Sequence, residues 1–308
     1  MHKKILISGV TGFLGYSIAQ KLLEEKHFVI GLKRTTSDLW RCEDFLDKIE
    51  WIATDNDYWK EQVISLQPDI VIHAAWSGVT ATERDALSSQ LKNLELTAAM
   101  LDIAKQSNAK CFVGLGSQAE YGVLNSVVSE DYVTNPVNAY GMTKILAATL
   151  LQKICELYSI NWYWLRVFSV FGEKESTNWF IPFIIKSLIL NENEIKLSAC
   201  NQTYAYLYVK DFTEYVSEII RVKPQSGVYN ISGSNAKSLQ RIIEDIKILI
   251  GNTETKLNYG ALPPRANQSS IIEGSMKKFH ENIGDIKETD WQDALSSTIA
   301  YYQNEKNN

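Results

Sequence analysis

Three glycines between the first strand-like segment and the first helix-like segment constrain the fold of this chain more than any other feature. An apolar run at residues 4–7 leads into Gly9, Gly12 and Gly15, and apolar side chains recur at helical spacing from residue 18 onward. Glycine permits a tight turn and a close backbone approach to a pyrophosphate, and the following helix presents free N–H groups. This order predicts a dinucleotide-binding turn, and the alternative is a turn that is tight for structural reasons alone. The other cofactor contacts predicted in this segment are Thr11, Phe13 and Leu14.

Apolar, strand-like runs alternate with helical patterns through the first half of the chain. Continuous apolar strands that alternate with helices are typical of a parallel sheet covered on both faces. The strands are predicted at residues 4–7, 28–32, 50–53, 69–72, 111–115 and 162–167.

The alternation weakens after Gly172, which indicates a second structural unit. Beyond it we predict a helix at 181–190, a strand at 204–209 and a helix at 211–221 that return the chain to the sheet, a strand at 227–231, and a closing helix containing Trp291 and Ala294. The predicted fold is α/β, a Rossmann-type doubly wound parallel sheet with a smaller mixed α/β C-terminal lobe. The predicted limits are 1–172 with 202–232 for the nucleotide-binding domain, and 173–201 with 233–308 for the substrate-binding lobe.

Charge and composition exclude several classes of protein. The 308 residues include 31 basic and 36 acidic side chains, for a formal net charge of -5. Scattered basic residues argue against nucleic-acid binding, and no apolar run approaches the roughly 18 residues of a membrane span. The four cysteines and four histidines show no metal-ligand spacing, so we expect no metal, reduced buried thiols and a cytoplasmic protein.

The end of the second predicted strand carries two cations. An NAD site usually has an acidic residue there, to accept hydrogen bonds from the adenosine ribose, whereas Lys33 and Arg34 suit a 2′-phosphate. We therefore predict a preference for NADP(H) over NAD(H), the alternative being a solvated loop that happens to be basic. Further cofactor contacts are predicted after the third and fourth strands, at Asp55, His73, Ala74 and Ala75. A histidine at a strand end is often a core residue, so His73 carries little weight.

Three residues predict catalysis. Ser117 ends the fifth strand, and Tyr140 and Lys144 share a helix face four residues apart. A phenol needs a neighbouring positive charge to lower its pKa toward neutrality, and Lys144 is placed to supply it. Because Y-x-x-x-K often occurs by chance, the pair alone would equally suit two surface residues.

Taken together, these motifs resemble the extended short-chain dehydrogenase/reductase family over nearly the whole chain. Such proteins act on nucleotide-linked sugars as epimerases, 4,6-dehydratases and reductases. The resemblance implies that Tyr140 is the general acid/base, Lys144 binds the nicotinamide ribose and Ser117 orients the substrate oxygen. It also places Asn93 near the cofactor, in a mainly structural role.

Several positions depart from the family pattern. The Asp-Glu pair that eliminates water in the 4,6-dehydratases is Gln118-Ala119 here, which argues against dehydration. The customary substrate asparagine is Ser169 and the customary arginine is Tyr204, whereas Arg265 matches an arginine that often binds the diphosphate. The resemblance thus implies a nucleotide-diphosphate sugar, held by Ser117, Gln118, Ser169, Tyr204 and Arg265.

The expected function is NADPH-dependent reduction of the 4-keto group of a nucleotide-diphospho-6-deoxy or 3,6-dideoxy hexose, in the synthesis of surface-polysaccharide sugars. One alternative is a nucleotide-sugar 4-epimerase, and another is a non-catalytic NADP-sensing regulator. The two apolar stripes of the helix at 141–158 exceed what one sheet contact needs, so we expect a homodimer through the helices at 85–107 and 141–158.

Overall fold

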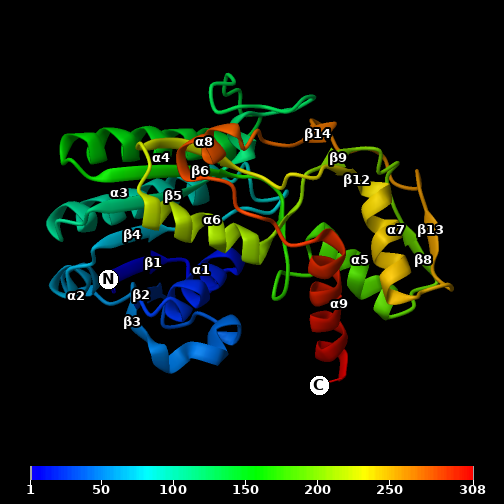
Figure 1. Ribbon diagram of the computed structural model, residues 1–308, viewed down its shortest axis with the longest axis horizontal. Coiled ribbons are helices and arrows are strands. Elements are labelled where there is room, and N and C mark those ends of the chain that lie inside the picture. The colour runs from blue at the N-terminus through cyan, green and yellow to red at the C-terminus, as the bar shows by residue number, and fades with distance from the viewer. Residues whose placement is uncertain (1, 308) are drawn as a thin grey trace.

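A seven-stranded parallel sheet forms the larger part of the protein (Figure 1). The computed structural model describes residues 2–307, with side chains up to residue 304. The strand order is β3-β2-β1-β4-β5-β6-β11, and every pairing in this sheet is parallel. The predicted α/β fold is therefore confirmed. The strands are β1 (Lys4–Ser8), β2 (Phe28–Lys33), β3 (Ile49–Ala53), β4 (Ile70–His73), β5 (Cys111–Ser117), β6 (Asn161–Val167) and β11 (Gly227–Ile231).

Helices cover both faces of this sheet, which explains why its strands are apolar along their whole length. Successive residues of β1 alternate between two cores: Ile5 and Ile7 pack toward one set of helices, and Leu6 toward the other. The first set is α1 (Phe13–Glu24), α6 (Val209–Val222) and α8 (Lys277–Ile283). The second set is α2 (Trp59–Leu66), α3 (Leu87–Gln106) and α4 (Ala139–Leu157). Among residues 2–307, no helix is both long enough and apolar enough to cross a membrane.

The strand order reverses between β1 and β4. From β1 the chain builds outward through β2 and β3 on one side, and from β4 through β5 and β6 on the other. A crevice forms beyond the carboxyl ends of the strands at such a reversal, and ligands of doubly wound folds bind there. Ser8 and His73 are paired in register at this end of β1 and β4.

A smaller lobe lies beside the sheet, at the right of Figure 1. Its apolar core is built from three helices, with Ile184, Ile243 and Leu295 among the buried side chains. The helices are α5 (Phe180–Ile189), α7 (Leu239–Ile250) and α9 (Trp291–Asn307). The short strands outside the main sheet are β7 (Val170–Phe171), β8 (Glu194–Lys196), β9 (Thr203–Tyr204), β10 (Leu207–Tyr208), β12 (Lys237–Ser238), β13 (Lys256–Asn258) and β14 (Ile271–Ile272).

One predicted strand is wrong. Residues 204–209 do not return to the main sheet as a single strand, because the chain changes partners midway. β9 pairs with β12 and β14, β10 pairs with β7, and α6 then begins at Val209. The seventh position of the main sheet is taken by β11 beside β6. The exact domain limits stay a prediction.

The first half of α3 buries polar side chains and exposes two leucines. Leu87 and Leu91 are 59% and 47% exposed, whereas Gln90, Asn93 and Thr97 are buried. On α4, one of the two predicted stripes is buried, through Ala147, Leu151 and Cys155. The other stripe leaves Leu146 and Leu157 51% and 71% exposed.

Candidate active site

The glycine turn touches the end of β4 so closely that no side chain fits. Gly9 has φ +78°, and a Cβ on it would lie 2.6 Å from the amide nitrogen of Ala75. A Cβ on Gly15 would lie 2.0 Å from the carbonyl oxygen of Gly9. The turn and Ala74-Ala75 therefore form one surface at the point where the strand order reverses.

The start of α1 leaves its N–H groups available. Gly12 is the N-cap residue and makes no side-chain cap, and the first turn contains no acidic side chain. The first N–H groups of a helix have no partner within it and attract anions. The turn, including Thr11, Phe13 and Leu14, thus fits the diphosphate of a dinucleotide cofactor. Arg41, which the sequence did not single out, donates from Nη1 to the Thr11 carbonyl over 3.3 Å and adds a half-buried cation beside the turn.

The loop after β2 presents the two predicted cations. Arg34 is exposed and Lys33 is half-buried. Asp55 braces this loop, because the amide of Thr35 donates to its Oδ1 and Oδ2 over 3.1 and 3.0 Å, and the Thr35 hydroxyl donates to the same carboxylate. These hydrogen bonds, first the one from the hydroxyl, lower the pKa of Asp55. The contact of Asp55 with adenine stays a prediction.

His73 supports the turn from inside the protein. Its Nδ1 lies 2.7 Å from the Ser8 hydroxyl and its Nε2 lies 3.0 Å from the Thr97 hydroxyl. Burial, aided by the charge of Lys144, lowers the pKa of His73 to about 3, so the ring is neutral. Both nitrogens are engaged, so neither is free to contact a cofactor.

Asn93 makes two hydrogen bonds to one residue of the loop that follows β4. Its Oδ1 accepts from the amide of Ser77 and its Nδ2 donates to the Ser77 carbonyl, each over 2.9 Å. These two bonds fix the loop between β4 and α3, which lies beside the catalytic residues.

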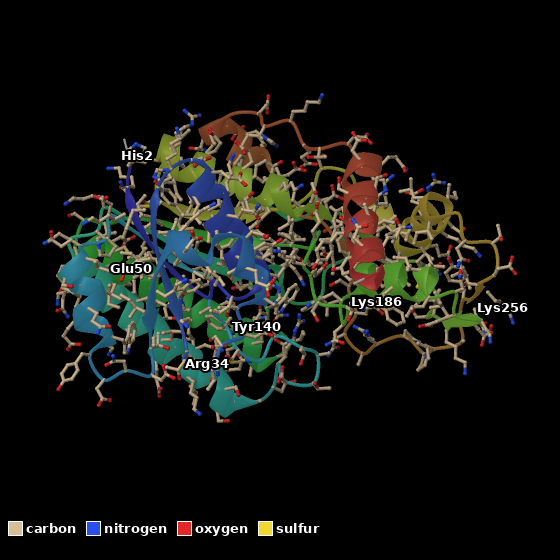
Figure 2. The ribbon with its side chains drawn as sticks, turned by 90° about the horizontal axis from the view of Figure 1, so that it is seen from below. His2, Arg34, Glu50, Tyr140, Lys186 and Lys256 are labelled. Carbon is tan, nitrogen blue, oxygen red and sulfur yellow. The ribbon has the colours of Figure 1, made fainter. Side chains whose placement is uncertain are left out.

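Ser117 and Tyr140 are brought together by β5 and α4. Tyr140 lies in the first turn of α4, where Asn138 caps the helix by accepting from the amide of Gly141. The Ser117 side chain is near enough to the phenol to lower the pKa of Tyr140. Figure 2 labels Tyr140 and Arg34 in the part of the protein that contains the main sheet. The structure therefore brings Ser117 and Tyr140 together.

The pKa of Tyr140 does not fall as expected. Burial raises the pKa of Tyr140, while the Ser117 side chain and the charge of Arg84 oppose the rise. The Arg84 guanidinium lies 5.1 Å from the centre of the Tyr140 ring, and its carbonyl accepts from the Tyr140 amide over 2.9 Å. The phenol is therefore protonated at neutral pH.

Lys144 is buried beside this pair. Its Nζ donates to the carbonyl of Leu115 over 2.5 Å and lies 3.6 Å from the centre of the Trp76 ring. Burial lowers the pKa of Lys144 to about 7, and the charge of Glu120 opposes that fall. Trp76 also meets the Tyr140 ring edge-on, with 6.2 Å between centroids, and its Nε1 donates to Gln90 over 3.0 Å.

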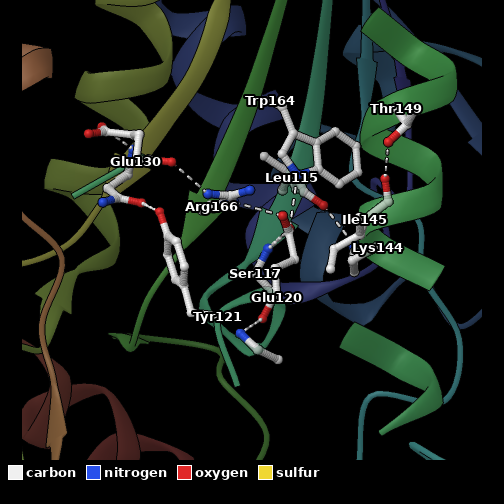
Figure 3. A network of polar contacts seen from close by, with 12 residues as sticks. Leu115, Ser117, Glu120, Tyr121, Glu130, Lys144, Ile145, Thr149, Trp164 and Arg166 are labelled. Atoms are coloured by element: carbon white, nitrogen blue, oxygen red, sulfur yellow. Dashed lines mark hydrogen bonds and ion pairs between the residues drawn. The ribbon is translucent and has the colours of Figure 1, made fainter. Parts of the chain in front are cut away.

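A buried carboxylate lies behind Ser117 (Figure 3). Oε1 of Glu120 accepts from the amide of Ser117 over 2.8 Å and from Nε1 of Trp164 over 2.9 Å. Oε2 accepts from Nε of Arg166 over 2.8 Å. Ser117 and Glu120 are the two ends of a capping box around η2 (Gln118–Glu120).

The predicted substrate residues lie on two groups of elements. Gln118 follows Ser117, and its Oε1 is buried with no partner in the structure. Tyr204 lies near Gln268 and Arg265, which both oppose the rise of its pKa, and packs against a cluster that contains Tyr121 and Phe168. Burial raises the pKa of Tyr204. Ser169 follows Phe168 and is half-buried, whereas Arg265 is exposed.

Sequence reasoning missed four residues of this region. Arg41, Trp76 and Arg84 lie in loops or irregular helix, where no periodic pattern marks them. Glu120 had a readable signal, because Ser117-Gln118-Ala119-Glu120 has the S-x-x-E spacing of a capping box.

Comparison with known proteins gives a consistent family. The model of the NAD dependent epimerase/dehydratase family matches residues 5–232. The CDP-abequose synthase of Salmonella muenchen is 25% identical, over 96% of this chain and 94% of that protein. The dTDP-6-deoxy-L-talose 4-dehydrogenase (NAD(+)) of Aggregatibacter actinomycetemcomitans is 22% identical, over 88% of this chain and 99% of that protein.

The fold is also that of solved structures. The UDP-N-acetylglucosamine 4-epimerase of Methanobrevibacter ruminantium M1, solved with UDP-N-acetylmuramic acid, superposes with a TM-score of 0.87 at 19% identity. The match covers 99% of each chain.

Proposed function

Because the chain belongs to the NAD dependent epimerase/dehydratase family and is an NAD(P)-dependent enzyme, we propose that it reduces the 4-keto group of a nucleotide-diphospho-6-deoxy or 3,6-dideoxy hexose with NADPH. The carrying observation is that the Ser117 and Tyr140 side chains lie together, with Lys144 buried alongside. The product would be a sugar donor for surface polysaccharide. Four buried, free cysteines fit the cytoplasm, where such an enzyme would act.

The pair of hydroxyls suits a carbonyl oxygen that becomes an alcohol. Ser117 donates a hydrogen bond to that oxygen, and Tyr140 transfers its phenolic proton to it as negative charge develops. The bound cofactor supplies the hydride to the carbonyl carbon. Lys144 then stabilises the phenolate that Tyr140 becomes. The raised pKa of Tyr140 favours this direction, because a proton donor must hold its proton at working pH.

The surroundings of Ser117 argue against dehydration. Elimination of water needs a free acid and a free base, and the two positions after Ser117 carry an amide and a methyl group. The next residue, Glu120, accepts hydrogen bonds from three donors and is fully buried. Both of its oxygens are therefore engaged, which leaves no free acid or base at this position.

The proposed cofactor preference rests on Lys33 and Arg34. They place two cations where the adenosine ribose is expected, while the Asp55 carboxylate beside them is engaged by Thr35. The nucleotide sugar would lie across η2 and the smaller lobe, with Gln118 near the sugar and Tyr204 and Arg265 near the nucleotide diphosphate. The unpaired Oε1 of Gln118 supports this, since a buried acceptor without a donor is costly unless a ligand supplies one.

A 4-epimerase is the second candidate. The Ser117–Tyr140 pair could remove a proton from an alcohol and return it to a carbonyl oxygen while a bound nicotinamide cofactor would accept and return the hydride, and the Methanobrevibacter 4-epimerase has the same fold. An epimerase keeps its cofactor bound and consumes none, so the two functions give opposite results in a single assay.

The test is NADPH oxidation with a panel of CDP-, dTDP-, GDP- and UDP-linked 4-keto-6-deoxyhexoses, with NADH in parallel. We expect stoichiometric NADPH consumption with one nucleotide. Conversion of a nucleotide hexose to its 4-epimer without net consumption, by protein that carries cofactor from purification, would establish the alternative.

We also propose a homodimer formed through α3 and α4. These helices pack on each other, and both leave apolar side chains in solvent: Leu87 and Leu91 on α3, and Leu146 and Leu157 on α4. Exposed apolar side chains on two helices that pack on each other support an interface here.

A further inference from the structure

Glu120 links β5 and β6 beside the catalytic residues. It follows β5, and its carboxylate reaches the side chains of Trp164 and Arg166 on β6 while also accepting from the amide of Ser117 (Figure 3). The side chain is fully buried. The catalytic hydroxyl of Ser117 is therefore held by the same carboxylate that is tied to β6.

The three partners of Glu120 are all donors. A carboxylate accepts only, so it can satisfy the Ser117 amide, the indole and the guanidinium together. A glutamine of the same shape would turn an NH2 group toward one of these donors. The site therefore requires an ionised acid, and a neutral cap would not replace it.

The Glu120 carboxylate is a buried negative charge near two buried cations. Arg166 lies against Glu120, with side chains 9% and 0% exposed, and Lys144 is the second buried cation that Glu120 influences. The other titratable or charged groups facing the cluster are Tyr140 on α4, Arg84 before α3, neutral His73 at the end of β4, and Tyr121 with Glu130 beside Arg166. Removing the carboxylate would leave Arg166 and Lys144 as uncompensated neighbours.

We propose that Glu120 is a positioning residue of the reaction: it holds Ser117 at the end of β5 and supplies the negative charge that keeps Lys144 protonated next to Tyr140. The effect of Glu120 on Lys144 depends only on residues of this chain, whereas its catalytic consequence rests on the proposed function. The charge of Glu120 favours the protonated form of both groups, because it raises the pKa of Lys144 and that of Tyr140.

The first test reads Lys144 directly and needs neither substrate nor cofactor. Protein labelled with 13C at the lysine ε-carbons is titrated by NMR, and the Lys144 signal is assigned by its loss in Lys144→Arg. We expect a midpoint near 7 in the unchanged protein. In Glu120→Gln we expect a midpoint lower by about 1 unit or more.

Trp164→Phe is the matched control. It removes one hydrogen bond to the same carboxylate and keeps both the charge and an aromatic ring. We expect it to destabilise the protein while leaving the Lys144 midpoint in place. An unchanged midpoint in Glu120→Gln, or an equal shift in Trp164→Phe, would overturn the proposal.

A second variant covers the case in which Glu120→Gln does not fold. Arg166→Lys keeps every charge but loses the guanidinium that faces Glu120, so the carboxylate is less neutralised. The Lys144 midpoint should then move to higher pH, and a midpoint that stays or falls contradicts the proposal.

The catalytic consequence is read from the pH profile of NADPH-dependent reduction. Reduction needs protonated Tyr140 and protonated Lys144, so the alkaline limb of kcat should move to lower pH in Glu120→Gln. A merely structural role would lower kcat without moving the limb. If the unchanged protein reduces no member of the substrate panel, the proposed function fails, while the NMR titration still decides the role of Glu120.

Discussion

The side chains of Ser117 and Tyr140 lie close together, although one residue ends β5 and the other lies in the first turn of α4. They meet because α4 packs on β5 and because Asn138 starts the helix at the point that faces the strand end. Both residues are nearly closed to solvent. A carbonyl oxygen placed at this pair would meet two hydroxyl donors in a site that excludes water, where such contacts are strongest.

Replacing Tyr140 with phenylalanine should remove the proton donor and leave the fold intact. We expect kcat for reduction to fall by about 10²–10⁴-fold, the usual contribution of a general acid. Binding of NADPH, followed by its fluorescence, should change little. Tyr158→Phe at the other end of α4 is the control, since that side chain is 43% exposed and far along the helix. Near-normal turnover in Tyr140→Phe would contradict the assignment.

Cofactor preference should depend on Lys33. In Lys33→Asp we expect the ratio of kcat/KM for NADPH to that for NADH to fall by about tenfold or more, which corresponds to about 1.4 kcal/mol. An acidic side chain there repels a 2′-phosphate and accepts hydrogen bonds from an unmodified ribose. The control is Lys60→Asp, which makes the same charge change at an exposed position on α2, away from this loop. A variant that keeps its full preference for NADPH would show that the basic loop is only solvated.

The features that sequence could predict are local or periodic. The glycine turn, the six strands from β1 to β6 and the Tyr140–Lys144 spacing each follow from a few neighbouring residues, and the structure contains them all. The separate β9 and β10 could not be predicted, because their strand partners lie far away in the chain.

The burial of polar side chains could not be predicted from the sequence either. In the first half of α3, Gln90, Asn93 and Thr97 are buried while Leu87 and Leu91 are exposed, because each polar residue has a partner there: Trp76, Ser77 and His73. The rise in the pKa of Tyr140 was missed for a related reason, since a motif shows a neighbouring cation but not the loss of water around both groups.

Stability below neutral pH should depend on His73. Its pKa is about 3 in the folded protein and about 6.5 when the chain is unfolded. The unfolded state therefore binds more protons between these values, and the contribution of neutral His73 to stability is complete above pH 6.5 and is lost as pH falls toward 3. His73→Asn should cost about 1–3 kcal/mol near pH 7.5. Urea unfolding should show this difference narrowing toward pH 4, and a constant difference would contradict the buried, neutral ring.

An acidic residue on the exposed stripe of α4 should separate a dimer. Leu146 is 51% exposed in the single chain, and Leu87 and Leu91 on α3 are also exposed, so an aspartate at 146 would be buried without a partner if two copies meet here. We expect light scattering to give twice the chain mass for the unchanged protein and the chain mass for Leu146→Asp. Leu190→Asp is the control, because Leu190 is 52% exposed but follows α5 in the smaller lobe. A single-chain mass for the unchanged protein would remove the dimer, and a dimer that survives Leu146→Asp would place the interface elsewhere.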